Sequence, residues 1–246
     1  MGILEDVLTT LNTEASVREV CQGLFFTVVL TRNCGLAATL SRDALRQGQP
    51  STHEPGSLLK KTALDLARMA FSDSIPEAAV GMATINSLVE IDEESCQVLN
   101  ARDLIAEKGK DRRVAIVGHF PFLAELREVA EELWVIEKNP GEGDFPEAEA
   151  EGLLPDADVV GITGTAFTNH TVEQLLALCS PEAYVVVLGG STPLSPVLFD
   201  HGIDAISGTK VIDPDLALRC VSEGATYRQI KGVRKLTMLR DGRKAW

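Results

Sequence analysis

The sequence lacks several features that would place it in a well-known class of proteins. Its five cysteines are far apart and form no C-x-x-C pair, which argues against a zinc ribbon or a disulfide framework and for a reducing compartment. No apolar run reaches the roughly eighteen residues that a membrane-spanning helix needs. The first ten residues carry acids where a signal peptide has a basic start. We therefore expect a soluble, cytoplasmic protein with no membrane partner.

Positive charge is also scarce. Lys and Arg total 23 against 36 Asp and Glu, which gives a formal net charge of −13. Because so acidic a chain repels a phosphate backbone, we expect no nucleic-acid partner. The charges are unevenly placed: residues 125–158 are rich in carboxylates, whereas residues 228–246 hold seven basic side chains and one acid. We interpret the first segment as solvated surface and the second as a basic tail over acidic surface.

Two patterns of apolar residues divide the chain near residue 108. Before that point, short strand-like stretches are followed by segments with helical periodicity; the strands are expected at 17–23, 24–32 and 36–41, and the helices at 57–71, 76–90 and 100–109. A polar stretch, 42–57, crosses between the two groups. After that point, short apolar runs alternate with helical segments; the runs lie at 114–118, 133–137, 157–163, 184–190 and 203–208. Runs that are apolar on both faces are typical of parallel strands covered by helices. The sequence predicts an α/β protein, with a small α+β domain at 1–108 and a Rossmann-like domain with a mostly parallel sheet at 109–246.

Small and hydroxyl residues gather where the expected parallel strands end. An open parallel sheet binds its ligands outside the carboxyl ends of its strands. In this chain those ends read Gly118-His119-Phe120-Pro121, Glu137-Lys138-Asn139-Pro140, Thr163-Gly164-Thr165, Gly189-Gly190-Ser191-Thr192-Pro193 and Gly208-Thr209-Lys210. Turns collect such residues for conformational reasons alone. A ligand-binding cleft and a set of ordinary loops are therefore both open interpretations.

Glu137 is the most specific of these residues. It follows Gly118 by nineteen positions, close to the offset of ~20 at which a Rossmann acid reaches a ribose hydroxyl. Phe120 and Pro121, however, bring bulk to the place where a pyrophosphate needs close approach, and proline has no amide hydrogen to donate. This disfavours NAD and FAD but leaves S-adenosylmethionine open, since that molecule has no pyrophosphate. The sequence names no cofactor.

Two further residue types have competing explanations. His119 and His170 are expected in loops at the same edge of the sheet, where histidine and carboxylate could hold a divalent ion. Their spacing carries no information, so we predict no metal ligand. Asn86 lies within an expected helix beside Gly81 and Ala83, which indicates close packing against something polar. The side chain is either a buried structural amide or a ligand contact.

Six stretches together resemble, in order, the motifs of the heavy-metal chelation domain family, formerly a domain of unknown function. They read "GMATINSL", "VGHFPF", "VIEKNPGEGDFPEAEAE", "LPDADVVGITGTAFTNHT", "VLGGSTPLSPVLFDHG" and "ISGTKVIDP". The resemblance covers most of the chain and is strongest over residues 114–214. It implies a first domain similar to the N-terminal domain of enolases and a Rossmann-like second domain. It also implies a site between the domains that handles flavin-, pterin- or siderophore-like chelating molecules.

The resemblance assigns site residues position by position. It implies ligand-binding roles for Asn86, Gly118, Phe120, Pro121, Thr163, Gly164, Thr165, Asn169, Gly190, Ser191, Thr192 and Pro193. Glu137 and His119 are the candidates for acid–base catalysis. One departure is Gly189-Gly190-Ser191-Thr192-Pro193, where a Gly-Pro-Ser-Thr-Pro pattern is expected and the extra glycine loosens the turn.

Three functions are compatible with this resemblance. The first is an enzyme that condenses or hydrolyses a small heteroaromatic or chelator-like precursor. The second is a non-catalytic module that binds a metal–chelate complex. The third is an S-adenosylmethionine-dependent methyltransferase. For the assembly, a homodimer is one alternative, because acidic proteins of this size are often dimers.

Overall fold

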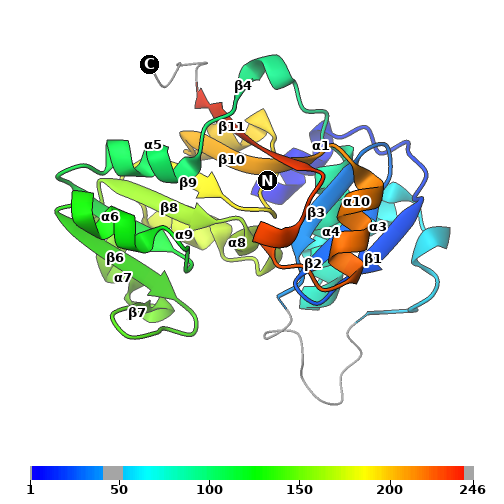
Figure 1. Ribbon diagram of the computed structural model, residues 1–246, viewed down its shortest axis with the longest axis horizontal. Coiled ribbons are helices and arrows are strands. Elements are labelled where there is room, and N and C mark those ends of the chain that lie inside the picture. The colour runs from blue at the N-terminus through cyan, green and yellow to red at the C-terminus, as the bar shows by residue number, and fades with distance from the viewer. Residues whose placement is uncertain (1, 41–51, 241–246) are drawn as a thin grey trace.

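The structure is a computed structural model that describes residues 2–40 and 52–240 (Figure 1). It contains a three-stranded antiparallel sheet and an eight-stranded mixed sheet that lie side by side. Residues 41–51, most of the polar crossing expected between the first strands and helices, lie outside the described residues. The α/β class and the mostly parallel large sheet are confirmed.

The described residues before Glu90 form the small sheet and several helical segments. The strands β1 (Glu19–Gln22), β2 (Phe26–Leu30) and β3 (Cys34–Ala38) pair in chain order. The helical segments are α1 (Ile3–Thr10), η1 (Leu58–Lys60), α3 (Ala63–Arg68), η2 (Met69–Phe71) and α4 (Ile75–Leu88). The three predicted strands and the two predicted helical segments are confirmed, whereas α1 was not predicted.

Helix α4 is almost completely buried between the small sheet and the rest of the molecule. Its sequence is rich in small residues, and these let the backbones approach closely. A Cβ atom on Gly35 of β3 would overlap the carbonyl oxygen of Ala83, and one on Gly81 would overlap the backbone of Ala70. Because only glycine fits these contacts, α4 is locked against β3 on one side and η2 on the other.

The remaining residues build the large sheet. Its strands are β4 (Cys96–Gln97), β5 (Arg113–Val117), β6 (Glu132–Glu137), β7 (Phe145–Pro146), β8 (Val159–Thr163), β9 (Tyr184–Leu188), β10 (Ala205–Val211) and β11 (Val233–Leu239). They lie in the order β4-β11-β10-β9-β8-β5-β6-β7. All neighbours from β10 to β7 are parallel, while β11 and β4 run antiparallel to theirs. The five predicted strands are confirmed as β5, β6, β8, β9 and β10.

Helices and short helical turns connect these strands. The α-helices are α5 (Ala101–Lys108), α6 (Leu123–Val129), α7 (Ala150–Leu153), α8 (Thr165–Thr168), α9 (Val172–Leu178) and α10 (Pro214–Ser222). The short turns are η3 (Glu93–Ser95), η4 (Glu147–Glu149), η5 (Leu154–Asp156), η6 (Pro196–His201) and η7 (Tyr227–Gln229). Within the described part of the chain, no helix is long and apolar enough to cross a bilayer.

The basic tail predicted for residues 228–246 is wrong over its described part. Residues Val233–Leu239 form β11, which lies inside the sheet between β10 and β4, and its Leu236 and Met238 are buried. The segment was predicted to be a tail because it is rich in basic residues. Its apolar residues lie between and beside the basic ones, and their burial makes the segment a strand. Strand β11 then brings basic side chains to a defined place in the fold.

The main buried cluster runs through both halves of the chain. It includes Ile3 and Val29 from the first half, Phe167 and Ile206 from the second, and Ala83 of α4 between them. The two sheets therefore share a continuous apolar core. The domain boundary at residue 108 and the similarity of the first half to enolases stay predictions.

Candidate functional site

The candidate site lies where the order of the large sheet changes direction. The chain passes from β5 to β6 on one side, and later places β8 on the other side of β5. In an open parallel sheet this arrangement leaves a crevice at the carboxyl ends of the two adjacent strands. The loops that follow β5 and β8, which carry His119 and Thr165, line both cavities described below.

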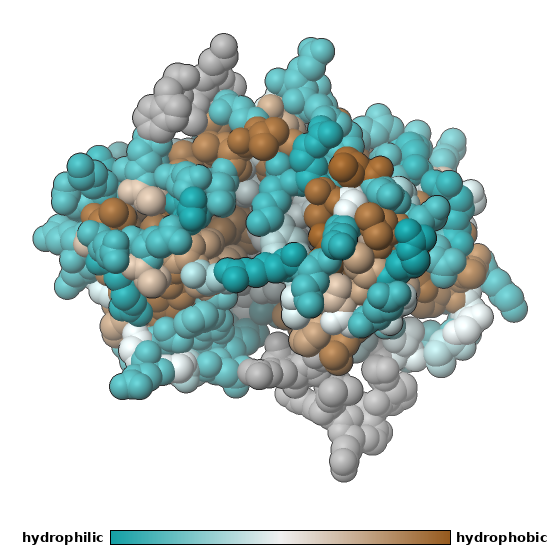
Figure 2. All heavy atoms as spheres, viewed as in Figure 1, coloured by the Kyte–Doolittle hydropathy of each residue, from teal (hydrophilic) through white to brown (hydrophobic). Residues whose placement is uncertain are grey.

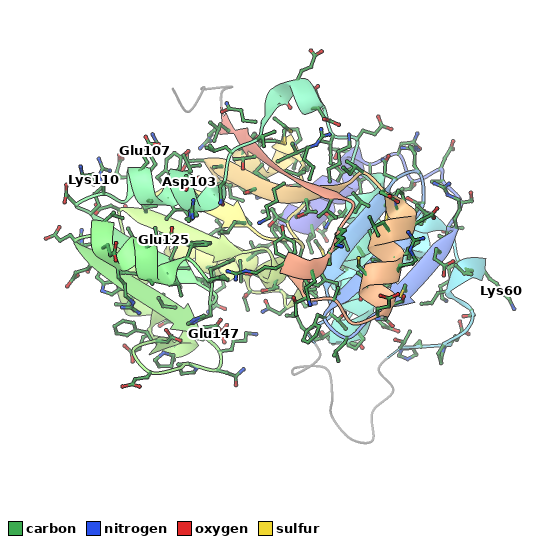
Figure 3. All side chains as sticks on the ribbon, viewed as in Figure 1. Lys60, Asp103, Glu107, Lys110, Glu125 and Glu147 are labelled. Carbon is green, nitrogen blue, oxygen red and sulfur yellow. The ribbon has the colours of Figure 1, made fainter. Side chains whose placement is uncertain are left out.

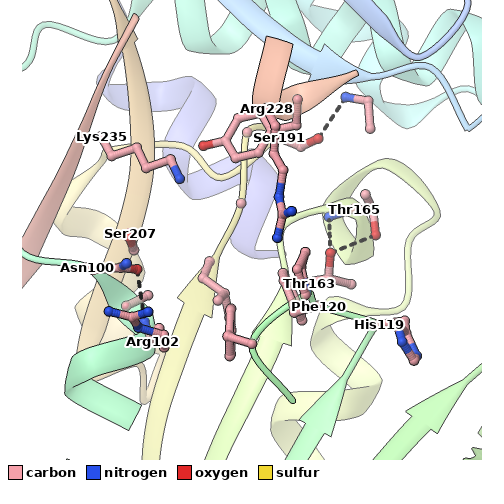
Figure 4. A pocket seen from close by; sticks show the side chains of 18 of the residues that line it. Asn100, Arg102, His119, Phe120, Thr163, Thr165, Ser191, Ser207, Arg228 and Lys235 are labelled. Atoms are coloured by element: carbon pink, nitrogen blue, oxygen red, sulfur yellow. Dashed lines mark hydrogen bonds between the residues drawn. The ribbon is translucent and has the colours of Figure 1, made fainter. Parts of the chain in front are cut away.

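The larger cavity has a volume of about 500 Å³ and lies between the two sheets (Figure 4). Phe26 and Ala38 come from the small sheet, and the other lining residues, from Asn100 onward, come from the large sheet and its connections. Two stacked aromatic pairs line it: the ring centroids of Phe26 and Tyr227 are 5.6 Å apart, and those of Phe120 and Phe122 are 5.3 Å apart. Figure 2 shows the hollow between the two halves, with hydrophilic side chains reaching over it.

A smaller cavity of about 290 Å³ adjoins the larger one. His119, Phe120, Thr163 and Thr165 line both cavities and form the partition between them. The smaller cavity adds polar residues from the ends of β6 and α8; these include Glu137, Lys138, Asn139, Asn169 and Thr171. The site thus has an aromatic compartment and a polar compartment.

Gly118 lies where a Rossmann fold has its phosphate-binding loop, and its backbone adopts a conformation that favours glycine. Its φ is +108°, and a Cβ atom there would lie 3.0 Å from the Cβ of Thr163. Thr163 in turn holds the next turn of chain, because its hydroxyl is 3.0 Å from that of Thr165. This loop joins the ends of β5 and β8 and presents the ring of Phe120 to the cavity.

The structure pairs His119 with a residue that the sequence reasoning missed. Nδ1 of His119 lies 3.3 Å from Oδ2 of Asp144, a carboxylate whose side chain is only 4% exposed. The same oxygen accepts a hydrogen bond from the amide of Gly141, which closes the turn before β7. Glu137, the other candidate for acid–base catalysis, lies in the smaller cavity, where its carboxylate accepts from the amide of Lys138.

The side chain of Asn86 links the small sheet to the turn that follows β9. Its Nδ2 donates to the carbonyl oxygens of Leu36 (2.8 Å) and Ser191 (3.1 Å), while its Oδ1 is buried without a hydrogen-bond partner. Nearby, the hydroxyl oxygen of Ser191 accepts from the amide of Ala38 at 2.8 Å. Asn86 is not among the residues that line the two cavities. Of the two explanations for Asn86, this placement favours the buried amide.

The other predicted site residues fall into two groups. The larger cavity brings together His119, Phe120, Pro121, Thr163, Thr165, Gly190 and Ser191, and the smaller one adds Gly118, Glu137 and Asn169. Neither cavity is lined by Gly164, Thr192 or Pro193; a Cβ on Gly164 would overlap the hydroxyl of Thr192. Those three residues shape the turns rather than line the cavities.

His170 does not join His119. Its Nε2 lies 3.0 Å from the carbonyl oxygen of Ser72, and its backbone has a φ of +62°. Over residues 2–40 and 52–240, no group of three or more His, Cys, Asp or Glu side chains is arranged to hold a metal ion. Burial raises the pKa of the Cys34 thiol to about 12 and that of Cys179 to about 11. Such thiols are poor metal ligands, because the thiolate is the binding form.

Comparison with known sequences decides the family. Two sequence models with the same description, "Putative heavy-metal chelation", match residues 4–89 and 100–240. The chain belongs to this family. An uncharacterized protein of Methanocaldococcus jannaschii is 27% identical over 184 residues, which are 72% of this chain and 71% of that protein.

Solved structures from the heavy-metal chelation family have the same fold. A protein of unknown function from Desulfitobacterium hafniense is 27% identical and superimposes with a TM-score of 0.82, covering 97% of this chain and 98% of that one. One from Pyrococcus horikoshii, 22% identical, has a TM-score of 0.84 and covers 97% and 100%. The second likeness concerns the fold alone.

The motifs that identify the heavy-metal chelation family do not include the charged residues of the larger cavity. Arg102, Tyr227, Arg228 and Lys235 line it, as does Phe26. The basic residues from 228 onward could have indicated a positively charged site. They were instead interpreted as a surface tail, so Arg228 and Lys235 were not predicted to line a cavity. No local pattern marked Phe26 or Arg102, because both reach the cavity only through tertiary packing.

Proposed function

We propose that the protein binds a small planar, chelator-like molecule in the larger cavity. In heavy-metal chelation, this molecule, and not the protein's own side chains, would supply the ligands to the metal. The ligand is of the flavin, pterin or siderophore-precursor type. The observation that carries the proposal is the pair of stacked aromatic contacts, Phe26–Tyr227 and Phe120–Phe122, that line one cavity of about 500 Å³.

Size and lining both suit such a ligand. Pockets for small molecules have volumes of roughly 300–1,000 Å³ and combine apolar walls with a few polar groups. Aromatic walls favour flat rings, because stacked or edge-to-face contacts add to the burial of apolar area. The hydroxyls of Ser191, Ser207 and Thr163 supply polar groups along the same lining.

The protein itself offers little direct chelation. The described residues hold no metal-binding cluster, and burial raises the pKa of the Cys21, Cys34, Cys96 and Cys179 thiols. A heavy metal prefers soft thiolate ligands. A chelating small molecule would supply the metal ligands that these side chains do not.

The catalytic form of the proposal gives His119 the role of general acid or base. Asp144 accepts from Nδ1 of His119, which leaves Nε2 to exchange a proton with a ligand in either cavity. Glu137 stands in the adjoining polar cavity. Condensation or hydrolysis of a chelator precursor needs proton transfers of this kind.

Two alternatives use the same geometry differently. A binding module would hold a metal–chelate complex in the larger cavity and leave His119 unused. A methyltransferase would place the ribose of S-adenosylmethionine on Glu137, at the end of the second strand of the Rossmann-like unit. The observation that supports the methyltransferase alternative is that Glu137 lines the smaller cavity.

Thermal unfolding with separate ligand classes tests the proposal. The classes are pterins, flavins, catechols, S-adenosylmethionine and divalent metals without an organic ligand. A ligand at a hundred times its Kd should raise the free energy of unfolding by about 2.7 kcal/mol. Stabilisation by a planar organic compound supports the proposal; stabilisation by metal alone, with none by any planar compound, contradicts it.

Three variants then separate the functions. For an enzyme, His119→Ala and Glu137→Gln should keep ligand affinity and lose turnover. For a methyltransferase, Glu137→Gln should weaken only S-adenosylmethionine. Glu132→Gln, at the exposed start of the same strand β6, is the matched control and should behave as the wild type. If wild type turns over no compound that it binds, the binding module is favoured.

A further inference from the structure

The larger cavity concentrates positive charge in a strongly acidic protein. Arg102 of α5, Arg228 of η7 and Lys235 of β11 line it, and Glu125 is the one carboxylate among its described lining residues. In Figure 4 the side chain of Arg228 extends across the cavity towards Phe120 and Thr163. A chain with a net charge of −13 thus presents three cations at this cavity.

Among the described residues, two of the three cations lack a carboxylate partner. Arg102 is neutralised, because its guanidinium lies 2.7 Å from Asp103 and 3.0 Å from Glu125. Within the described parts of the chain, neither Arg228 nor Lys235 has a carboxylate oxygen within ion-pair distance. Uncompensated cations beside a cavity attract an anion and raise its local concentration.

The fold explains why these two cations reach the ligand-binding edge of the sheet. Strand β11 is antiparallel to β10, so its first residues lie beside the last residues of β10, with Lys235 opposite Thr209. The turn η7, which carries Arg228, is the last helical turn before this strand. Tyr227 is fixed there by a 2.7 Å hydrogen bond to Thr209, and the Lys235 ammonium lies 5.2 Å from the centre of the Tyr227 ring. Ring and cation are therefore held next to each other.

We propose that the ligand class of this cavity is a planar aromatic carboxylate. Its ring would lie against the aromatic pairs of the cavity, and its carboxylate would meet Arg228 and Lys235. A guanidinium suits a carboxylate because it can donate two parallel hydrogen bonds, and the ammonium adds a second positive charge. The inference rests on the proposed function and narrows it from planar molecules in general to anionic ones.

Two matched compounds test the charge without changing the ring. 2,3-Dihydroxybenzoate and 2,3-dihydroxybenzamide are both planar catechols, but only the first carries a carboxylate. Calorimetric titration of wild type should show about tenfold or more tighter binding of the benzoate, since a charge-assisted hydrogen bond is roughly twice as strong as a neutral one. The preference should shrink between ~50 mM and ~500 mM salt, because exposed cations are screened.

A double variant locates the preference. Arg228→Gln with Lys235→Gln should bring the two affinities close together, mainly by weakening the benzoate. Lys60→Gln with Lys110→Gln removes two exposed positive charges elsewhere on the molecule (Figure 3) and is the control that should keep the preference. The thermal transition of both double variants checks that they fold.

The outcomes separate this inference from the proposed function. Equal binding of both compounds by wild type overturns the charge inference while supporting a planar ligand. A preference that survives in the Arg228→Gln, Lys235→Gln variant overturns the assignment to these residues. Binding of neither compound overturns the aromatic carboxylate as the ligand class, and the proposed function is then judged by whether any pterin or flavin binds.

Discussion

Nδ2 of Asn86 lies 3.1 Å from the carbonyl oxygen of Ser191, which follows it by 105 residues in the chain. The hydrogen bond joins a helix of the first half to the turn that lines the larger cavity. The same amide also donates to Leu36 of β3. Asn86 therefore holds the small sheet, its covering helix and the cavity turn in one arrangement.

Asn86→Ala should lower the free energy of unfolding by about 2 kcal/mol, because it leaves the carbonyl oxygens of Leu36 and Ser191 without their donor in a partly buried place. Urea denaturation measures this loss. Asn12→Ala is the control: Asn12 is exposed and its side chain accepts one local hydrogen bond, from Glu14. Equal stability of the two variants would contradict the bracing role of Asn86.

Gly190→Ala should weaken ligand binding by about tenfold. A Cβ atom at this position would lie 3.0 Å from ring carbons of both Phe26 and Tyr227. The stacked pair must then shift into the cavity, and overpacking of this kind costs about 1–3 kcal/mol. Titration with whichever planar ligand the wild type binds measures the change in affinity.

Gly152→Ala is the matched control for that substitution. Gly152 lies within α7, and no atom comes within 4 Å of a Cβ placed there. Alanine should therefore raise stability by about 0.5–1 kcal/mol through its better helix propensity and leave binding unchanged. A loss of affinity in Gly152→Ala as large as in Gly190→Ala would show that the effect is not specific to the cavity.

Glu77 should make stability fall in acid. Burial acts to raise the pKa of this carboxyl, but hydrogen bonds from the amide and ring of His53 and from the Ser72 hydroxyl outweigh it and hold the pKa below the usual value. A lowered native pKa contributes stability that is complete above the unfolded value of about 4.3 and is lost as pH falls through the native value.

Glu77→Gln should therefore be less stable than wild type by about 2 kcal/mol near neutral pH, with a smaller difference as the pH falls below about 4. Urea denaturation over this pH range gives both curves. Glu90→Gln, at an exposed carboxylate paired with Arg32, is the control and should cost less than about 1 kcal/mol. A constant gap between Glu77→Gln and wild type at all pH values would refute the expected linkage.

The buried thiols should be nearly inert in the native protein. With pKa values raised to about 12 for Cys34 and about 11 for Cys179, less than about one part in a thousand of either is thiolate at about pH 8. Alkylation followed by peptide mass analysis should label both slowly in the native state and completely in denaturant. Rapid native labelling of either would also reopen direct metal binding by the protein.

Much of the fold was accessible from local patterns. The apolar runs that became β5, β8, β9 and β10 are buried on both faces over most of their length, and β6 is so at Val135 and Ile136, so their composition alone indicated parallel strands. Segment 76–90 became α4 because proline near its start and helical spacing are local signals. Strand β11 was missed because its basic residues dominated the interpretation.

Local sequence was sufficient to predict the α/β class and to locate the ends of the parallel strands, including the one where Phe120 and Pro121 stand in place of the glycines of a pyrophosphate loop. Each depends on neighbours within a few residues, where periodicity and backbone chemistry act. Tertiary packing was needed to place His119 beside Asp144 and to bring Arg228 and Lys235 to the larger cavity. It was also needed to show that Asn86 bridges Leu36 and Ser191 and lines neither cavity. Those contacts join residues from separate elements, and their partners are chosen by strand order and by the antiparallel return of β11, which no local pattern encodes.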